Sequence, residues 1–210
     1  MINVLIADDH AILRSGLKEI LVKQLEGAVC GEAMDAQEVL AQVQSRNWDL
    51  VILDVTMRGR SGLDVLRELK VVRPKLPVLI LSMHPEDQYG KRMLRAGASG
   101  YLEKENAPEE LIKAIRRVLA GGRYVSPTLA EKLAFDLNVN EDRPVHETLS
   151  DREFEVLRMI ALGIAVTEIA ERLHLSVTTV STYRARILEK MNLATTAELI
   201  RYALRNDLVD

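Results

Sequence analysis

Short apolar runs alternate with amphipathic segments over residues 1–122. Each run has the length of a buried strand, and the segments between the runs repeat apolar residues at helical spacing. In the first segment, for example, Ile12, Leu13 and Leu17 fall on one helical face. The apolar runs are residues 4–7, 28–30, 50–53, 78–81 and 100–102.

The helical segments also carry start and stop signals. Asp35 precedes the second segment as an acidic cap, and Pro108 opens the last segment, which Gly121 and Gly122 end. Five strand–helix units in series predict an α/β domain built on a doubly wound, five-stranded parallel sheet.

Residues 123–147 follow a different pattern. They contain one short helical segment, 128–137, and then the polar stretch 138–144, which has little to bury. This composition predicts a linker between two domains.

Residues 148–210 carry helical patterns in place of the strand pattern. Ser150 and Thr195 each stand three residues before a glutamate, which is the spacing of a capping box. A short helix over 168–173 and a longer one over 177–191 are joined by a tight connector. Two helices joined in this way, the second carrying basic residues, predict a helix-turn-helix.

Composition and charge narrow the class of protein. A formal net charge of −3 argues against a polybasic nucleic-acid binder, although it leaves room for a local basic face. The single cysteine excludes an internal disulfide. Asp8 interrupts the N-terminal apolar run, and no apolar stretch approaches the ~20 residues that a spanning helix needs. We therefore expect a cytoplasmic protein without a membrane segment.

Ionisable side chains follow three of the predicted strands. Asp8 and Asp9 end the first run, Asp54 ends the third, and Lys104 follows the fifth. Because the carboxyl ends of parallel strands meet at one edge of a sheet, these groups are expected to lie together. Clustered carboxylates repel one another unless a cation joins them, and an oxygen-only site suits Mg²⁺. The pattern predicts a magnesium site with a lysine in reach of a phosphoryl group.

These motifs resemble those of a known family of regulators. Residues 1–122 resemble a bacterial two-component receiver domain, and residues 148–210 resemble the LuxR-type helix-turn-helix of the NarL/FixJ response regulators. The resemblance covers nearly the whole chain and implies a flavodoxin-like receiver followed by a small all-α DNA-binding domain. The receiver motif consists of Asp8-Asp9-His10, Asp54-Val55-Thr56-Met57, Ser82 and Tyr101-Leu102-Glu103-Lys104.

The resemblance implies that Asp54 is the phosphoacceptor. A carboxylate is a weak nucleophile toward phosphate, so charge must be neutralised as it attacks. Mg²⁺ is the implied cofactor for this task. Its implied ligands are Asp9, Asp54 and the backbone carbonyl of Thr56, with Asp8 acting through water.

The resemblance assigns three more residues to the response. Lys104 is expected to pair with one phosphoryl oxygen and Ser82 to hydrogen-bond another, while Tyr101 rotates inward as Ser82 moves. One position departs from the family pattern, because Arg58 stands where a proline is usual, four residues after the phosphoacceptor. We expect this change to alter partner contact rather than phosphorylation.

Two other functions fit parts of the pattern. A phosphatase with an aspartyl nucleophile also combines an α/β sheet with Mg²⁺, but it would carry Asp-x-Asp on its first strand, whereas Asp8 and Asp9 are adjacent. A receiver used only as a protein-interaction platform would not need Asp54 and Lys104 intact. Phosphorylation measured with Mg²⁺ separates these alternatives, and we expect a regulator that is not an enzyme.

The helix expected over 177–191 has an apolar and a polar face. Val180 and Ile187 lie on the inward arc, while the outward arc carries hydroxyls and a methyl for base edges, flanked by cations for phosphates. Backbone amides at its cap are placed to bind a phosphate. The expected DNA-contacting residues are Ser176, Thr178, Thr179, Ser181, Thr182, Arg184, Ala185, Arg186 and Lys190.

Together these features predict a phosphorylation-dependent, DNA-binding transcription regulator. A sensor histidine kinase or a histidine phosphotransfer protein would phosphorylate Asp54 and thereby shift a two-state equilibrium. The phosphorylated form is expected to be a homodimer on two promoter half-sites, with RNA polymerase as a further partner.

Overall fold

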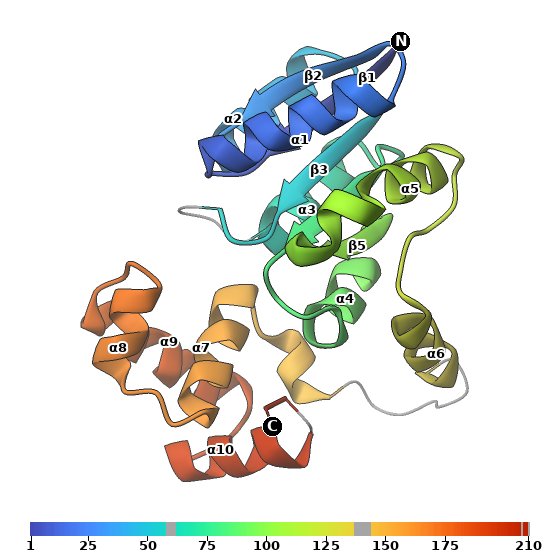
Figure 1. Ribbon diagram of the computed structural model, residues 1–210. Helices are drawn as coiled ribbons and strands as arrows, with labels where there is room; N and C mark the ends of the chain where they lie inside the picture. The colour runs from blue at the N-terminus through green and yellow to red at the C-terminus, as the bar shows by residue number, and fades with distance from the viewer. Residues whose placement is uncertain (58–61, 137–143, 207, 210) are drawn as a thin grey trace. The chain divides into compact units, whose positions relative to one another are not determined.

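The computed structural model divides the chain into two units (Figure 1). The first unit covers residues 1–140 and the second covers residues 141–210. The residues that the structure describes are 1–57, 62–136, 144–206 and 208–209. The loop around Arg58, where the sequence departs from the family pattern, therefore lies outside the described residues.

A five-stranded parallel sheet forms the centre of the first unit (Figure 1). Its strand order, β2-β1-β3-β4-β5, confirms the doubly wound arrangement predicted from the alternating pattern. The strands are β1 (Ile2–Ala7), β2 (Ala28–Ala33), β3 (Leu50–Asp54), β4 (Val78–Ser82) and β5 (Gly100–Glu103). β3 and β4 are buried along their whole length, as strands covered by helices on both faces must be.

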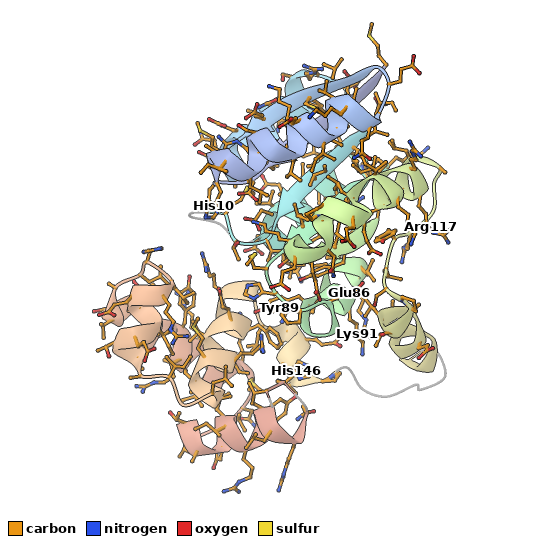
Figure 2. The ribbon with its side chains drawn as sticks, in the orientation of Figure 1. His10, Glu86, Tyr89, Lys91, Arg117 and His146 are labelled. Carbon is orange, nitrogen blue, oxygen red and sulfur yellow. The ribbon has the colours of Figure 1, made fainter. Side chains whose placement is uncertain are left out.

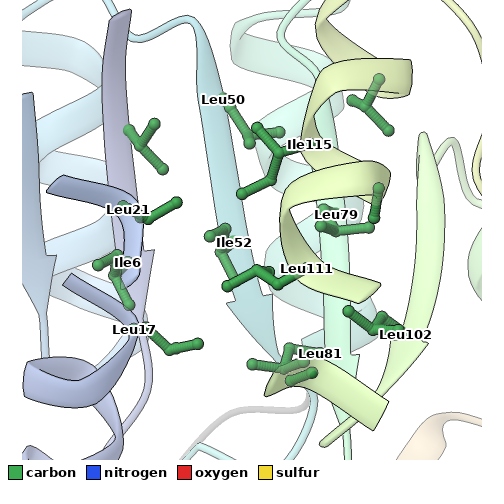
Figure 3. Packing of buried hydrophobic residues seen from close by; sticks show 14 of the residues in the cluster. Ile6, Leu17, Leu21, Leu50, Ile52, Leu79, Leu81, Leu102, Leu111 and Ile115 are labelled. Carbon is green, nitrogen blue, oxygen red and sulfur yellow. The ribbon is translucent and has the colours of Figure 1, made fainter. Parts of the chain in front are cut away.

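Helices cover both faces of this sheet. On one face α1 and α5 pack over the central strands, with Leu111 and Ile115 of α5 lying against Ile52 and Leu79 (Figure 3). This apolar layer fixes the strand ends relative to one another, which is what positions the site. The helices are α1 (Ala11–Gln24), α2 (Ala36–Ser45), α3 (Gly62–Val72), α4 (Glu86–Arg95) and α5 (Ala107–Leu119), with a 3₁₀ turn, η1, at Lys104–Asn106.

The short helix predicted after the sheet forms as α6 (Pro127–Asp136) and packs on α4. Leu129 covers Gly90 so closely that a Cβ at Gly90 would lie 2.6 Å from the Leu129 Cδ2 atom. Glu86 lies at the start of α4 (Figure 2). Its carboxylate accepts a hydrogen bond from the backbone amide of Ser126 over 2.9 Å. These contacts attach α6 to the first unit.

The second unit is built from short helices. Both predicted capping boxes are present, at Ser150 and at Thr195. The short helix α8 begins two residues earlier than predicted, because its N-cap is Ala165, which carries no capping side chain that would mark the start. The elements are η2 (Val145–Thr148), α7 (Asp151–Ala161), α8 (Val166–Arg172), α9 (Val177–Lys190) and α10 (Thr196–Arg205).

A helix that crosses a membrane must be long and apolar. Within the described part of the chain, none of the helices combines the length and the apolar character that crossing a bilayer requires.

Candidate functional site

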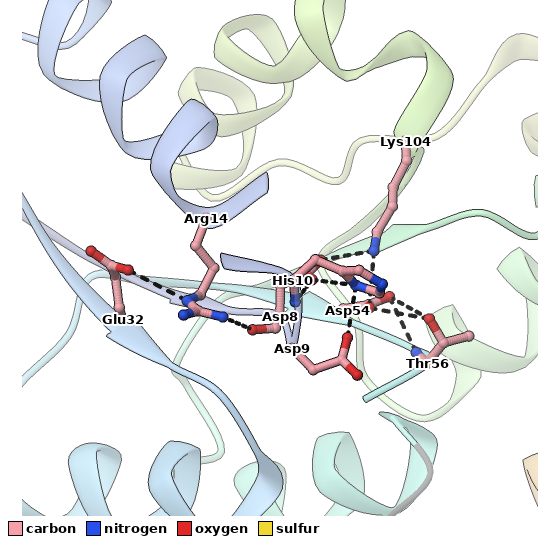
Figure 4. Close-up of polar contacts among 8 residues, drawn as sticks. All are labelled: Asp8, Asp9, His10, Arg14, Glu32, Asp54, Thr56 and Lys104. Carbon is pink, nitrogen blue, oxygen red and sulfur yellow. Dashed lines mark hydrogen bonds and ion pairs between the residues drawn. The ribbon is translucent and has the colours of Figure 1, made fainter. Parts of the chain in front are cut away.

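The predicted acidic residues meet at the carboxyl edge of the sheet (Figure 4). Asp8 and Asp9 follow β1, and Asp54 is the last residue of β3, the strand that pairs with β1. The chain crosses to opposite faces of the sheet after these two strands, so a crevice forms between them. Asp8 and Asp54 are each only 1% exposed, which makes their like charges costly without a neighbouring cation.

Lys104 supplies a positive charge to both buried carboxylates. Its Nζ atom lies 2.8 Å from Asp8 Oδ2 and 2.9 Å from Asp54 Oδ2. Burial raises the pKa of Asp54, the charge of Asp8 adds to this rise, and the Lys104 ammonium opposes it. For Lys104, burial would lower the pKa, but the two carboxylates raise it overall, so the amine is charged at neutral pH.

Thr56 fixes the direction of the Asp54 carboxylate. The backbone amide of Thr56 donates to Asp54 Oδ1 over 3.1 Å, and its hydroxyl lies 3.1 Å from each carboxylate oxygen. The sequence predicted a role for the Thr56 carbonyl as a metal ligand and not this use of the amide and hydroxyl. The Asp54 carboxylate is therefore held in one orientation before any ligand binds.

The sequence did not predict a role for Arg14, a buried side chain that hydrogen-bonds to the backbone of Asp8. Arg14 is 6% exposed, and its Nη1 atom donates to the backbone carbonyl of Asp8 over 2.7 Å. Its Nε atom lies 3.4 Å from Glu32 on β2. A signal was present, because Arg14 falls on the same helical face as Leu17 and Leu21, where a solvated charge is not expected.

The predicted switch residues lie beside the acidic site. Ser82 is fully buried at the end of β4, and its hydroxyl accepts a hydrogen bond from the His84 amide over 3.0 Å. Tyr101 is 1% exposed, and its hydroxyl donates to the His84 carbonyl over 2.8 Å. The Tyr101 ring, expected to rotate inward, is therefore already inward in this structure.

The donor atoms at this edge fit a divalent cation. Asp8, Asp9, His10 and Asp54 can each place one ligand atom so that all lie within 4.8 Å of one another. Three of the four residues offer carboxylate oxygens, the ligands that Mg²⁺ prefers. A bound cation would also favour the ionised form of Asp54, which burial disfavours.

Helix α9 of the second unit has the two faces predicted for it. Val180 and Ile187 are fully buried, whereas Thr178, Thr182, Ala185, Arg186 and Lys190 are exposed. The Ser176 hydroxyl caps the helix by accepting from the Thr179 amide over 3.0 Å. The remaining predicted contacts, Thr179, Ser181 and Arg184, are partly exposed.

Lys190 differs from the other predicted DNA contacts. Its Nζ atom lies 2.7 Å from Glu153 Oε2, and Glu153 is 3% exposed. The same carboxylate accepts from the amide and hydroxyl of Ser150 at the start of α7. Lys190 therefore joins the end of α9 to the capping box of α7.

Two known protein families match this chain, one in each unit. A model described as "Response regulator receiver domain" matches residues 4–116, and one described as "Bacterial regulatory proteins, luxR family" matches residues 147–203. This chain is a response regulator of the NarL/FixJ family. It combines a receiver domain with a LuxR-type DNA-binding domain.

Full-length relatives support the same family for this response regulator. It is 37% identical to "Response regulator GacA" of Pseudomonas aeruginosa, with 100% of this chain and 99% of the relative covered. It is 35% identical to "Response regulator UvrY" of Escherichia coli K12, covering 99% of this chain and 96% of the relative. Both alignments therefore span the two units of this chain.

Among solved structures, RcsB from Salmonella enterica serovar Typhimurium resembles this response regulator. That RcsB structure is described as bound to promoter rprA in the presence of the phosphomimetic BeF3⁻. The two chains are 28% identical with a TM-score of 0.60, over 96% of this chain and 98% of RcsB. The likeness extends over both units.

Proposed function

We propose that Asp54 is the phosphoacceptor and that its phosphorylation controls promoter binding. The observation that carries this proposal is the bridge from Lys104 to Asp8 and Asp54, at 2.8 and 2.9 Å. In the proposed organisation, residues 1–122 form the receiver, residues 123–147 the linker, and residues 148–210 the DNA-binding domain.

The proposed chemistry is transfer of a phosphoryl group from a phosphohistidine to Asp54. One Asp54 oxygen bonds to phosphorus as the phosphorus–nitrogen bond of the donor breaks, and the imidazole leaves with a proton from solvent. Lys104 lies where it can hold a phosphoryl oxygen, since its ammonium already contacts Asp54. Thr56 keeps the carboxylate oriented during the attack.

Mg²⁺ is the cofactor we propose for this site. Asp9, Asp54 and the Thr56 carbonyl would hold it, with Asp8 acting through a water molecule. When bound, the ion supplies neutralising charge between the carboxylate and the incoming phosphoryl group. Lys104, which contacts Asp54, would then be placed to pair with a phosphoryl oxygen.

The response to phosphorylation is proposed to begin at Ser82. A phosphoryl oxygen on Asp54 offers the Ser82 hydroxyl a charged acceptor, and movement of the hydroxyl toward it draws Ser82 away from the His84 amide. Tyr101 also bonds to His84, so a shift of this loop changes the packing of Tyr101 and of α4 behind it. This change biases a two-state equilibrium toward a homodimer that binds two half-sites.

The DNA-reading element we propose is α9. Its exposed arc carries small hydroxyl-bearing side chains and Arg186, while its apolar side is anchored in the second unit. A kinase or phosphotransfer protein and promoter DNA are the proposed partners, and the cytoplasm, where that DNA lies, is the proposed compartment. We propose a regulator rather than an enzyme, and contact with RNA polymerase stays a prediction.

The experiment combines phosphorylation with DNA binding in the full-length chain. Acetyl phosphate and Mg²⁺ should label the wild-type protein, and Asp54→Asn should abolish the label. Asp64→Asn serves as the control, because this carboxylate is 44% exposed on α3, away from the site. Labelling of Asp54→Asn, or equal affinity for selected DNA fragments with and without phosphodonor, would refute the proposal.

A further inference from the structure

The imidazole of His10, at the junction of β1 and α1, contacts two carboxylates of the acidic site. His10 Nδ1 lies 2.8 Å from Asp9 Oδ1 and 3.1 Å from Asp8 Oδ1. The backbone amide of His10 also donates to Asp8 Oδ1 over 2.8 Å, which ties the residue to the carboxylates (Figure 4). The remaining oxygen, Asp8 Oδ2, faces Lys104. His10 and Lys104 thus approach Asp8 through different oxygens.

The position of the imidazole nitrogen suits a ligand of the same ion. Neighbouring ligands of an octahedral dication with bonds of about 2.1 Å stand about 3.0 Å apart. Both distances from Nδ1 to the carboxylate oxygens bracket this value. In the tautomer that carries the proton on Nδ1, this nitrogen donates a hydrogen bond to Asp8 Oδ1. In the neutral tautomer that carries its proton on Nε2, Nδ1 offers a lone pair to an ion with no movement of the backbone.

The chemistry of the nitrogen distinguishes among cations. Mg²⁺ prefers oxygen ligands and gains little from imidazole, whereas Mn²⁺, and more strongly Ni²⁺, accepts nitrogen readily. The His10 side chain is 68% exposed, so its ring can turn toward an ion without disturbing the core. The site therefore offers three carboxylates to any hard dication and one further ligand to transition metals.

We propose that His10 is an additional ligand that makes this receiver favour first-row transition dications over Mg²⁺. This inference rests on the proposed metal site and adds a selectivity to it. The ligand set is the one proposed above, Asp9, Asp54 and the Thr56 carbonyl, together with His10 Nδ1. An ion held this way still leaves Asp54 beside Lys104, so the phosphoacceptor stays in place.

The decisive measurement is pulsed electron paramagnetic resonance of Mn²⁺ bound to the full-length protein. Wild type should show hyperfine coupling to a directly bound ¹⁴N nucleus, and His10→Gln should lose it. His174→Asn is the matched control, because His174 is exposed in the second unit at φ 53°, a conformation that asparagine tolerates. This control should keep the coupling.

Calorimetric titrations provide a second readout. His10→Gln should weaken Ni²⁺ binding by about tenfold while leaving Mg²⁺ binding nearly unchanged. A Mn²⁺ spectrum without nitrogen coupling in wild type, or equal loss of Ni²⁺ and Mg²⁺ affinity in the variant, would overturn the role of His10. If phosphorylation with Mg²⁺ nevertheless proceeds at Asp54, only this inference fails. If neither Mn²⁺ nor Mg²⁺ binds, the metal site fails with it.

Discussion

Lys104 Nζ lies 2.9 Å from Asp54 Oδ2, and both side chains are almost completely withdrawn from water. The ammonium also serves Asp8, so one cation faces two buried carboxylates. A pair of buried charges is stable only while each has its partner, and the two buried carboxylates exceed the Lys104 ammonium by one negative charge. This excess charge favours binding of a further cation and lowers the stability of the folded protein while no cation is bound.

The first prediction is that Asp54→Asn stabilises the metal-free protein at neutral pH, by about 1 kcal/mol. Because the folded-state pKa of Asp54 is raised above its ordinary 3.8, the folded state loses stability as pH rises from that value through the raised pKa. Asparagine avoids this loss, so its advantage is present above the raised pKa and disappears below about pH 3.8.

Urea unfolding in EDTA, from below about pH 3.8 up to neutral pH, checks this prediction. The only tryptophan, Trp48, is buried in the first unit and reports that unit alone. Asp64→Asn should leave the midpoint unchanged, and Lys104→Met should lower it, since two carboxylates would then face each other unpaired. A destabilised Asp54→Asn protein at pH 7 would show that the charge of Asp54 supports the fold.

A second prediction concerns Glu153 in the second unit. Burial by itself would raise the pKa of Glu153, but hydrogen bonds from Lys190 and Ser150 lower it overall. A lowered folded-state pKa adds stability above the ordinary value of 4.5 and loses it as pH falls through the folded pKa. Glu153→Gln should therefore cost about 1–2 kcal/mol at pH 7, and the difference should shrink below pH 4.5.

Amide hydrogen exchange in α7 and α9 of the full chain is the appropriate measurement. The exposed Glu189→Gln on α9 is a matched control and should leave exchange unchanged. Equal protection in Glu153→Gln and wild type would mean that the contact between Lys190 and Glu153 contributes nothing to the packing of these helices.

The acidic site could be predicted because it depends on periodicity and strand ends alone. Alternation of apolar runs with helical segments identifies a parallel sheet, and parallel strands bring their carboxyl ends to one edge. Asp8, Asp54 and Lys104 could thus be placed together although 96 residues separate the first from the last. The two capping boxes were equally local, since each involves residues three apart.

The remaining features depend on how helices meet, which no local pattern contains. Glu153 and Lys190 are 37 residues apart, and the sequence predicts one as a capping-box residue and the other as a DNA contact, with nothing to pair them. Arg14 likewise becomes a support for Asp8 only once β1 and α1 are placed. The helix predicted within the linker packs on α4, where Leu129 lies over Gly90, a residue without a side chain.

The third prediction tests this docking of α6. Leu129 is 2% exposed, so Leu129→Ala should remove most of the apolar contact and loosen the helix by about 2 kcal/mol. Amide exchange over α6 should accelerate, while β3 and β4 keep their protection. Leu204→Ala, on an exposed site of α10, is the control. Unchanged exchange over α6 would show that the bond between Ser126 and Glu86 suffices to hold it.

The last prediction separates two cations at the proposed DNA interface. Arg186 is exposed on α9, whereas the Lys190 ammonium is bound to Glu153. Arg186→Ala should weaken binding to all DNA sequences and reduce the slope of log affinity against log salt by about 1, the loss of one phosphate contact. Lys190→Met should leave that slope nearly unchanged, because its charge is already neutralised within the protein. Titrations of the phosphorylated protein with a selected fragment and a scrambled one, from 50 to 200 mM salt, measure both slopes. If Lys190→Met lowers the slope as much as Arg186→Ala does, the lysine leaves Glu153 on binding and contacts a phosphate, as the sequence alone suggested.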